Sequence, residues 1–202
     1  MSALPATISA EPSRNGRFVC VVGPSGAGKD TLINLARERL ARDPRFVFVR
    51  RLITRPPYAG EDHEPISETQ FEEAERRSAL AISWRAHGLC YGVPDSVRTV
   101  VASGAVVVCN MSRAAIPDAR RLFPTSLALV TAPPEILAER IAARGRESVA
   151  DALARLRRKV QSPPDTAYDL VIENVTTPER GAADLEAFLR PLAGEHRGRR
   201  NG

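Results

Sequence analysis

Cysteine and aromatic residues are scarce in this sequence. The three cysteines, Cys20, Cys90 and Cys109, are too few and too scattered for a disulfide framework or a zinc site. Cys20 and Cys109 lie in apolar runs, so we expect them to pack in the core. Aromatic residues make up 5% of the chain, which leaves few rings on which the bases of a single-stranded nucleic acid would stack.

Long apolar runs are also missing. No stretch has the length that a membrane-spanning helix requires, so we expect a soluble, cytoplasmic protein with no membrane partner. Residues 1–16 lack the basic start and apolar centre of a signal peptide and are expected to be a disordered leader. The polar residues 194–202 are expected to be a flexible tail. The 17–193 segment between them suffices for one domain.

Lysine is rare, although the chain is basic. The net charge is +5, but the positive residues are spread along the chain and nearly all are arginine. Arginine binds phosphate oxygens bidentately through its planar fork, so small polyphosphate substrates explain this bias as well as nucleic acid does. With so few aromatic residues, nucleic-acid binding ranks last, and no nucleic-acid partner is expected.

Apolar strand-like runs alternate with helical patterns along most of the chain. This alternation predicts an α/β fold with a parallel sheet that helices cover on both faces. The expected strands are 17–22, 46–49, 104–110, 126–132 and 168–174, and the expected helices are 31–41, 96–103, 112–123, 134–144, 148–160 and 178–190. Residues 50–95 interrupt the pattern and show helical spacing only around 68–77, so we expect an insertion there that binds the acceptor. Ser148 and Asp151 resemble a capping box.

The segment GPSGAGKDT, residues 23–31, nearly matches the phosphate-binding pattern G-x-x-x-x-G-K-[ST]. It lies between an expected strand and an expected helix, the context that a genuine phosphate loop requires. We therefore expect a P-loop kinase core in which backbone N–H groups and the Lys29 ammonium bind the phosphates of a nucleotide. The expected nucleotide-binding residues are Gly23, Pro24, Ser25, Gly26, Ala27, Gly28, Lys29, Asp30 and Thr31.

Asp30 occupies the position at which the pattern has the magnesium-binding hydroxyl. A carboxylate is a good ligand for Mg²⁺, directly or through water, so we expect Asp30 to bind the metal. The negative charge gained at Asp30 is offset at Asn110, because an acidic residue often follows the strand that ends there. The alternative is a degenerate loop in a protein without catalysis, and the intact Lys29 and glycine frame weigh against it.

Arginines that follow the fourth expected strand are candidates for a lid, at about residues 140–160. Arginines that close over a transferring phosphoryl group stabilise its charge and exclude water. Arg140 and Arg144 lie four residues apart on one helix face, and Arg146 and Arg157 extend the set. An ordinary solvated helix face is the alternative for each of these arginines.

From GPSGAGK through TRPP, HGLCYGVP and RGRE to YDLVIEN, the chain resembles the guanylate-kinase-like nucleoside monophosphate kinases. This resemblance implies a P-loop core, an acceptor-binding insertion and a mobile lid. Four positions depart from the guanylate kinase pattern: Asp30, Tyr58, Ser83 and Asn110. Ser83 and Asn110 replace acidic residues that lie near the guanine in that family, so efficient phosphorylation of GMP is not expected.

The segments GPSGAGKDTL, ITRPPYAGEDHEPIS, SWRAHGLCYGVP, VVVCNMSR and ARGRES together resemble one branch, the ribose 1,5-bisphosphate phosphokinases. That resemblance implies transfer of the ATP γ-phosphate to ribose 1,5-bisphosphate, giving 5-phosphoribosyl 1-diphosphate (PRPP) during phosphonate breakdown. It also implies that Asp30 marks the branch and is not damage. The alternatives are a guanylate or other nucleoside monophosphate kinase, and a guanylate-kinase-like module that binds peptides without catalysis.

The expected active-site residues fall into two groups. Lys29, Arg55 and the lid arginines Arg140, Arg144 and Arg146 would be catalytic, because phosphoryl transfer depends on positioning and charge neutralisation. The acceptor would contact Arg51, Arg55, His63, His87, Tyr91 and Asn110. A structural role is the alternative for each histidine. Trp84 is expected to be a core residue, and Asp62, His63 and Glu64 are not expected to form a metal cluster, because consecutive residues rarely converge on one ion.

Overall fold

The computed structural model describes residues 16–57, 61–143, 148–159 and 167–194. Its elements in chain order are β1 (Arg17–Val22), α1 (Lys29–Leu40), β2 (Phe46–Phe48), β3 (Arg51–Ile53), β4 (His63–Pro65), α2 (Glu68–Arg76), β5 (Leu80–Ala86), β6 (Leu89–Pro94), α3 (Val97–Ala102), β7 (Val106–Asn110), the 3₁₀ helix η1 (Arg113–Ala115), α4 (Ile116–Leu122), β8 (Thr125–Thr131), α5 (Pro134–Ala142), α6 (Val149–Lys159), β9 (Leu170–Glu173) and α7 (Pro178–Leu192).

β1 lies at the centre of a parallel sheet with the order β2-β7-β1-β8-β9. Its side chains alternate between two hydrophobic cores: Val19 and Val21 pack on one face, and Phe18, Cys20 and Val22 on the other. Because both faces are buried, the strand is apolar along nearly its whole length. The loop after β1 therefore starts from a rigid position in the middle of the sheet.

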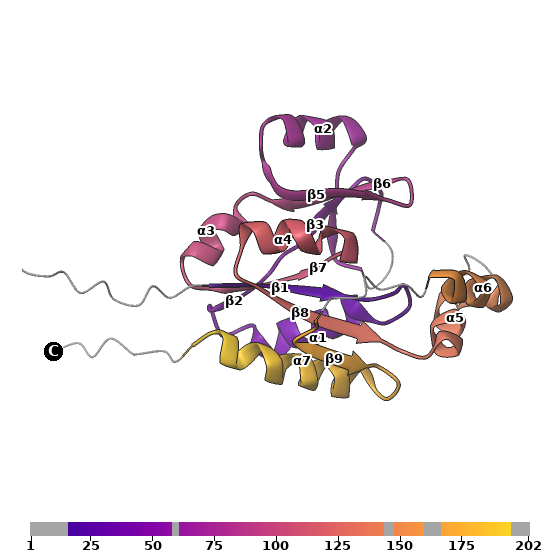
Figure 1. Cartoon of the computed structure of the whole chain (residues 1–202). Coiled ribbons are helices and arrows are strands. Elements are labelled where there is room, and N and C mark those ends of the chain that lie inside the picture. Colours follow the sequence, from indigo (N-terminus) through magenta and orange to yellow (C-terminus); the bar gives the residue numbers. More distant parts are fainter. Residues whose placement is uncertain (1–15, 58–60, 144–147, 160–166, 195–202) are drawn as a thin grey trace, which may run out of the picture.

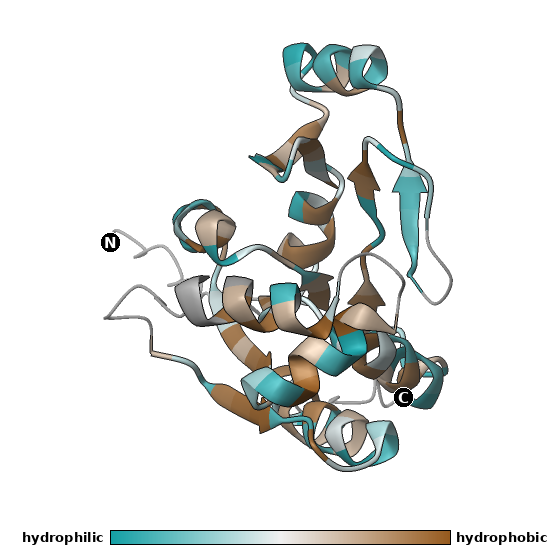
Figure 2. Ribbon diagram, turned by 90° about the vertical axis from the view of Figure 1, so that its right-hand side faces the viewer, coloured by the Kyte–Doolittle hydropathy of each residue, from teal (hydrophilic) through white to brown (hydrophobic). Residues whose placement is uncertain are grey.

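Helices cover both faces of this sheet (Figure 1). α1 and α7 pack together over one core, and α3 and α4 lie over the other. Figure 2 shows a mostly hydrophilic α2 at the top, away from the brown, hydrophobic strands lower in the molecule. The predicted α/β fold, with a parallel sheet between two layers of helices, is confirmed. Each expected strand and helix outside the insertion is present, with ends that differ by a few residues.

The insertion forms a second sheet with the order β4-β3-β6-β5. β4 pairs with β3 in parallel, and β6 pairs with β3 and β5 antiparallel. The sequence predicted only the helix here. β3 and β4 were missed because they are short and because the residues they bury include Arg51 and His63. β5 and β6 are longer but were missed as well, and their side chains are mostly half-buried. α2 begins with a capping box in which Ser67 and Gln70 exchange hydrogen bonds.

α5 and α6 pack against each other in the region of the expected lid. The backbone N–H of Asp151 donates to Ser148 Oγ at 3.2 Å, which caps the start of α6 as the sequence predicted. Arg144 and Arg146 lie outside the described residues, as do residues 1–15 of the expected leader and 195–202 of the expected tail.

Cys20 and Cys109 are buried and unbonded, which confirms their predicted place in the core. Burial raises the pKa of the Cys20 thiol well above its ordinary value and that of Cys109 to about 12, so both stay protonated at neutral pH. Within the described residues, no helix combines the length and the apolar composition needed to cross a membrane.

Candidate active site

The loop between β1 and α1 has a conformation that depends on glycine. Gly23, Gly26 and Gly28 have φ angles of 149°, 83° and 89°, which other residues rarely adopt. A Cβ atom on Gly23 would lie 1.9 Å from the carbonyl oxygen of Val130, so the backbone of β8 leaves it no room. The loop opens onto the N-terminus of α1, where backbone N–H groups and the helix dipole favour an anion. Its geometry suits a phosphate.

Asn174, directly after β9, supports this loop from the side. Its Nδ2 donates to the carbonyl oxygen of Ala27 at 2.8 Å, and it would lie 2.5 Å from a Cβ atom on Gly28. Sequence reasoning did not single out Asn174. The available signal was a polar residue at the carboxyl end of a strand, which belongs to the edge of a parallel sheet where ligands bind.

The Lys29 ammonium donates to the carbonyl oxygens of Gly23 and Pro24, at 2.9 Å each. These bonds fold the side chain back over the loop and bring a positive charge to the backbone N–H groups. Ser25 and Thr31 are exposed at the two ends of the same segment. The loop therefore combines backbone donors with the positive charge of the Lys29 ammonium.

Asp30, in the first turn of α1, has two partners on other elements. Asn110 Nδ2 donates to Asp30 Oδ1 at 2.7 Å, and Arg51 Nη2 lies 3.8 Å from the same oxygen. Asn110 ends β7, the neighbour of β1, so the sheet order places it beside the loop. The Asp30 carboxylate therefore receives a hydrogen bond from an amide and lies near the positive charge of an arginine. Its side chain is 34% exposed, which leaves it within reach of solvent and ions.

Arg51 joins the first sheet to the insertion. It is 7% exposed, and its guanidinium lies over the Tyr91 ring, 5.9 Å from the ring centre. Tyr91 in turn stacks on Trp84, with ring centres 5.3 Å apart. Trp84 also packs against the second core, so it serves both as core and as support for Tyr91. The series from Asp30 to Trp84 brings together residues that lie far apart in the sequence.

Arg55, after β3, is held by a carboxylate of the insertion. Its Nη2 lies 2.7 Å from each carboxylate oxygen of Glu61, and its Nη1 donates to the Pro56 carbonyl oxygen at 2.9 Å. Burial raises the pKa of Glu61, but the hydrogen bonds and charge of Arg55 outweigh this and hold the pKa below its usual range. The arginine expected to bind phosphate is thus already paired, and sequence reasoning missed Glu61 as its partner.

The side chain of His63 is completely buried beside this pair. Its Nε2 lies 3.0 Å from the carbonyl oxygen of Arg55, and its Nδ1 lies 3.8 Å from Glu61 Oε2. Nδ1 has no hydrogen-bond partner among the described residues. His63 therefore contacts the backbone of Arg55, and its burial favours a role exerted through Arg55.

Asp62 connects α1 to the insertion. Its two carboxylate oxygens lie 2.5 Å from Arg37 Nη1 and 2.7 Å from Arg50 Nε. Burial raises the pKa of Asp62, but the two arginines outweigh this and leave the pKa below its usual value. Asp62, His63 and Glu64 do not converge: within the described part of the chain, no group of three acidic, histidine or cysteine side chains could hold a metal ion.

The remaining predicted residues lie farther from this network or outside the description. His87 is exposed at the turn between β5 and β6, with a φ of 54°. Arg140 lies on α5, the helix that contacts Gly26, and its Nη1 is buried without a hydrogen-bond partner in the described chain. Arg157 belongs to α6.

Ser83, at a guanine-reading position of guanylate kinases, carries no acid but hydrogen-bonds to one. Its hydroxyl donates to Glu75 Oε1 at 2.6 Å, and Arg85 Nη2 pairs with the other oxygen of Glu75 at 2.7 Å. The hydrogen bonds from Arg85 and Ser83 lower the pKa of Glu75. The carboxylate comes from α2 and is already neutralised, so it holds α2 on the second sheet.

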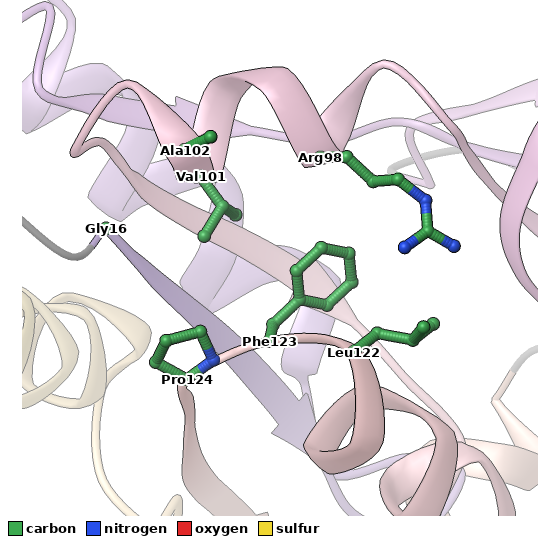
Figure 3. A pocket seen from close by; sticks show the side chains of 7 residues that line it. All are labelled: Gly16, Arg98, Val101, Ala102, Leu122, Phe123 and Pro124. Atoms are coloured by element: carbon green, nitrogen blue, oxygen red, sulfur yellow. The ribbon is translucent and has the colours of Figure 1, made fainter.

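A separate hollow of about 250 Å³ lies at the opposite end of β1 from the phosphate loop (Figure 3). Figure 3 shows the Arg98 side chain beside Phe123, and its guanidinium lies 5.8 Å from the centre of that ring. Gly16, which precedes β1, also lines the hollow. Because the length of β1 separates this hollow from Gly23, it is not part of the candidate active site.

Comparison with known proteins places the chain in a family. Residues 19–162 match the AAA domain family. The chain is 52% identical over 178 residues to "Ribose 1,5-bisphosphate phosphokinase PhnN" of Acidiphilium cryptum, covering 88% of this chain and 94% of that protein. It is also 52% identical over 176 residues to the protein of the same name from Methylobacterium radiotolerans, covering 87% of this chain and 98% of that protein.

The solved structures confirm the expected fold. The structure of guanylate kinase from Anaplasma phagocytophilum matches with a TM-score of 0.65 at 19% identity, over 90% of this chain and 88% of that one. This likeness shows a shared fold, while the closer sequence matches define the branch. The chain belongs to the AAA domain family and, among its curated relatives, to the ribose 1,5-bisphosphate phosphokinases.

Proposed function

We propose that this protein transfers the γ-phosphate of ATP to ribose 1,5-bisphosphate in the cytoplasm, in the breakdown of phosphonates. An oxygen of the 1-phosphate attacks the γ-phosphorus and the bond to the β-phosphate oxygen breaks, giving PRPP and ADP. The observation that carries this proposal is the 52% identity to phosphokinases of that name over nearly their whole length. The position of the buried Arg51 beside Asp30, at the end of the phosphate loop, is consistent with it.

The nucleotide binds in the loop of residues 23–31. Backbone N–H groups before α1 hold the phosphates, and Lys29 moves from the carbonyl oxygens of Gly23 and Pro24 to the β- and γ-phosphate oxygens. Arg140, Arg144 and Arg146 close over the transferring group. Nη1 of Arg140 is buried and has no hydrogen-bond partner among the described residues, which supports this role, because a phosphate oxygen would satisfy it.

Asp30 fits the Mg²⁺ that such kinases use. Mg²⁺ is commonly held by one or two carboxylates together with substrate phosphates and water, and Asp30 is a partly exposed carboxylate at the end of the phosphate loop. The ion would neutralise negative charge on the nucleotide phosphates. Arg51 and Asn110 hold the Asp30 carboxylate in place beside the loop.

The acceptor binds between the two sheets. Arg55, Arg51 and Tyr91 contact its phosphates, and Asn110, at the end of β7, contacts its other polar groups. His87, in the β5–β6 turn, would join them only if the bound acceptor extends to that turn. The attacking phosphate oxygen is ionised at neutral pH, so this site needs no strong general base. Positioning and charge neutralisation account for the catalysis.

The test is ADP release in the presence of ATP and Mg²⁺, with ribose 1,5-bisphosphate and GMP as separate acceptors. We expect turnover with the sugar bisphosphate alone, and a rate about 100- to 1000-fold lower in Lys29→Ala. Arg121→Ala, which removes a positive charge from the exposed face of α4, serves as the matched control with unchanged rate. Preferential turnover of GMP would overturn the proposal.

A further inference from the structure

His63 has a defined proton arrangement in the absence of substrate. The Arg55 carbonyl oxygen only accepts hydrogen bonds, so the Nε2 atom, 3.0 Å away, must donate to it. In the neutral ring the proton is then on Nε2, and Nδ1 carries a lone pair. That lone pair faces Glu61 Oε2 at 3.8 Å, which explains why Nδ1 has no hydrogen-bond partner in the described chain. A proton on Nδ1 would turn this contact into an ion pair.

Glu61 needs a cation whenever Arg55 leaves it. The carboxylate is 16% exposed and takes both of its short contacts from Arg55 Nη2. A buried carboxylate that loses its partner is costly, so it must gain another cation or a proton. Under the proposed function, a phosphate of the acceptor takes over the guanidinium of Arg55. His63 Nδ1 is the group placed to replace it.

Other charges around His63 are already engaged. The charged groups next to it, in contact or as strand and chain neighbours, are those of Glu61, Arg55, Arg51, Arg50 and Asp62, and Arg37 joins them through Asp62. Asp62 is paired with Arg37 and Arg50, and Arg51 with Asp30. Glu61 is therefore the carboxylate that a protonated His63 would meet.

We propose that Glu61 and His63 are positioning residues that couple binding of the acceptor phosphate to uptake of one proton. When the phosphate takes the guanidinium of Arg55, His63 Nδ1 gains a proton from solvent and donates it in a hydrogen bond to Glu61. When the product leaves, Arg55 returns to Glu61 and the proton is released. This inference rests on the proposed function, and it assigns to His63 a role that involves no direct contact with the sugar.

The experiment is isothermal titration calorimetry of ribose 1,5-bisphosphate into the full chain at pH 7.5, in buffers of different ionisation enthalpy. The dependence of the heat on the buffer gives the number of protons taken up. We expect about one proton fewer in His63→Asn and in Glu61→Gln than in the unmodified protein. The protons of the ligand contribute equally to every variant, so they cancel from this difference. His196→Asn, a histidine substitution in the C-terminal segment beyond the described residues, should match the unmodified protein.

The pH dependence of acceptor affinity adds a second measure of the same proton uptake. Where one proton is taken up, acceptor affinity falls by up to about tenfold for each unit of rising pH, and this slope should flatten in Glu61→Gln. Equal proton counts in the unmodified protein, His63→Asn and Glu61→Gln, each shown to be folded by circular dichroism, would overturn the inference.

A parallel titration with sulfate separates this inference from the proposed function. Sulfate is a doubly charged anion that does not titrate in this range, so any uptake of protons belongs to the protein. If ribose 1,5-bisphosphate fails to bind but sulfate still causes His63-dependent proton uptake, the proposed substrate is wrong and the exchange of Arg55 stands. If sulfate binds without proton uptake that depends on His63, the proposed replacement of Arg55 by His63 at Glu61 is contradicted.

Discussion

The sheet that carries the phosphate loop and the sheet of the insertion are held together differently. β1 is buried through apolar side chains on both faces, and the loop after it is shaped by backbone contacts to β8 and to Asn174. In the insertion the buried residues include Arg51 and His63, and pairs such as Arg55–Glu61 and Asp62–Arg50 connect the segments. The first region is thus fixed by apolar packing and backbone contacts, and the second is joined largely by ion pairs, whose partners a bound substrate would replace under the proposed function. Four predictions test this difference.

The largest effect is expected at Gly23, in the phosphate loop. Gly23→Ala would combine a φ of 149° with a Cβ atom 1.9 Å from the Val130 carbonyl oxygen, so the free energy of unfolding should fall by about 3 kcal/mol or more. Gly88→Ala, in the hairpin of the insertion, is the matched control. Its φ is 74° but no atom lies within 4 Å, so only backbone strain of about 1–2 kcal/mol is expected. Urea unfolding of both variants measures the difference between their losses of unfolding free energy. Equal losses would show that the close approach to β8 does not contribute.

The pair of Arg51 and Asp30 is expected to be coupled. Arg51→Met leaves the Asp30 carboxylate without its cation beside the polyphosphate, so kcat/KM for the acceptor should fall by roughly 30- to 100-fold, about 2–3 kcal/mol. Asp30→Asn should also lower kcat/KM, and the loss in the double variant should be smaller than the sum of the two single losses, with a coupling energy of about 1–2 kcal/mol. Steady-state kinetics of the two single variants and the double variant provide the cycle. Strict additivity would mean that the two side chains act separately.

Asn174 is expected to affect the phosphate loop and its ligand more than acceptor binding at the insertion. Asn174→Ala removes the donor to the Ala27 carbonyl oxygen and should cost about 1–2 kcal/mol of unfolding free energy. ATP affinity should weaken with it, while binding of the acceptor alone stays unchanged, because the proposed acceptor residues do not include Asn174. Separate titrations with each ligand test this. A loss of affinity for the acceptor alone would contradict the role of Asn174 in supporting the ATP-binding loop.

The smallest effect is expected at Asp62, which is partly exposed. Asp62→Asn should cost about 0.5–1 kcal/mol at neutral pH, because Arg37 and Arg50 lose their charge partner. The pKa of Asp62 in the folded protein lies below its usual value, so its contribution is present above about pH 4 and is lost as pH falls through the lowered pKa. Unfolding curves at neutral and acidic pH should therefore converge for the variant and the unmodified protein. A gap that persists in acid would assign the effect to packing.

Local patterns were enough to predict much of the molecule. A buried parallel strand, a glycine-rich loop and an amphipathic helix each leave a signal within a few neighbouring residues, so GPSGAGKDT and its flanking elements could be predicted. The short strands of the insertion left no such signal. β3 and β4 have three residues each, and their pairing depends on partners up to about forty positions away.

Residue types and their order by themselves determined the α/β class, the phosphate loop, the core cysteines and, through family resemblance, the kind of reaction. Only the tertiary structure decided which charges meet. The sequence did not indicate that Asp30 would share Arg51 with Tyr91, that Glu61 would hold Arg55, or that Asn174 would support Ala27. The physical reason is that an ion pair or a hydrogen bond between distant residues depends on how the two sheets pack, and no short-range periodicity encodes that distance.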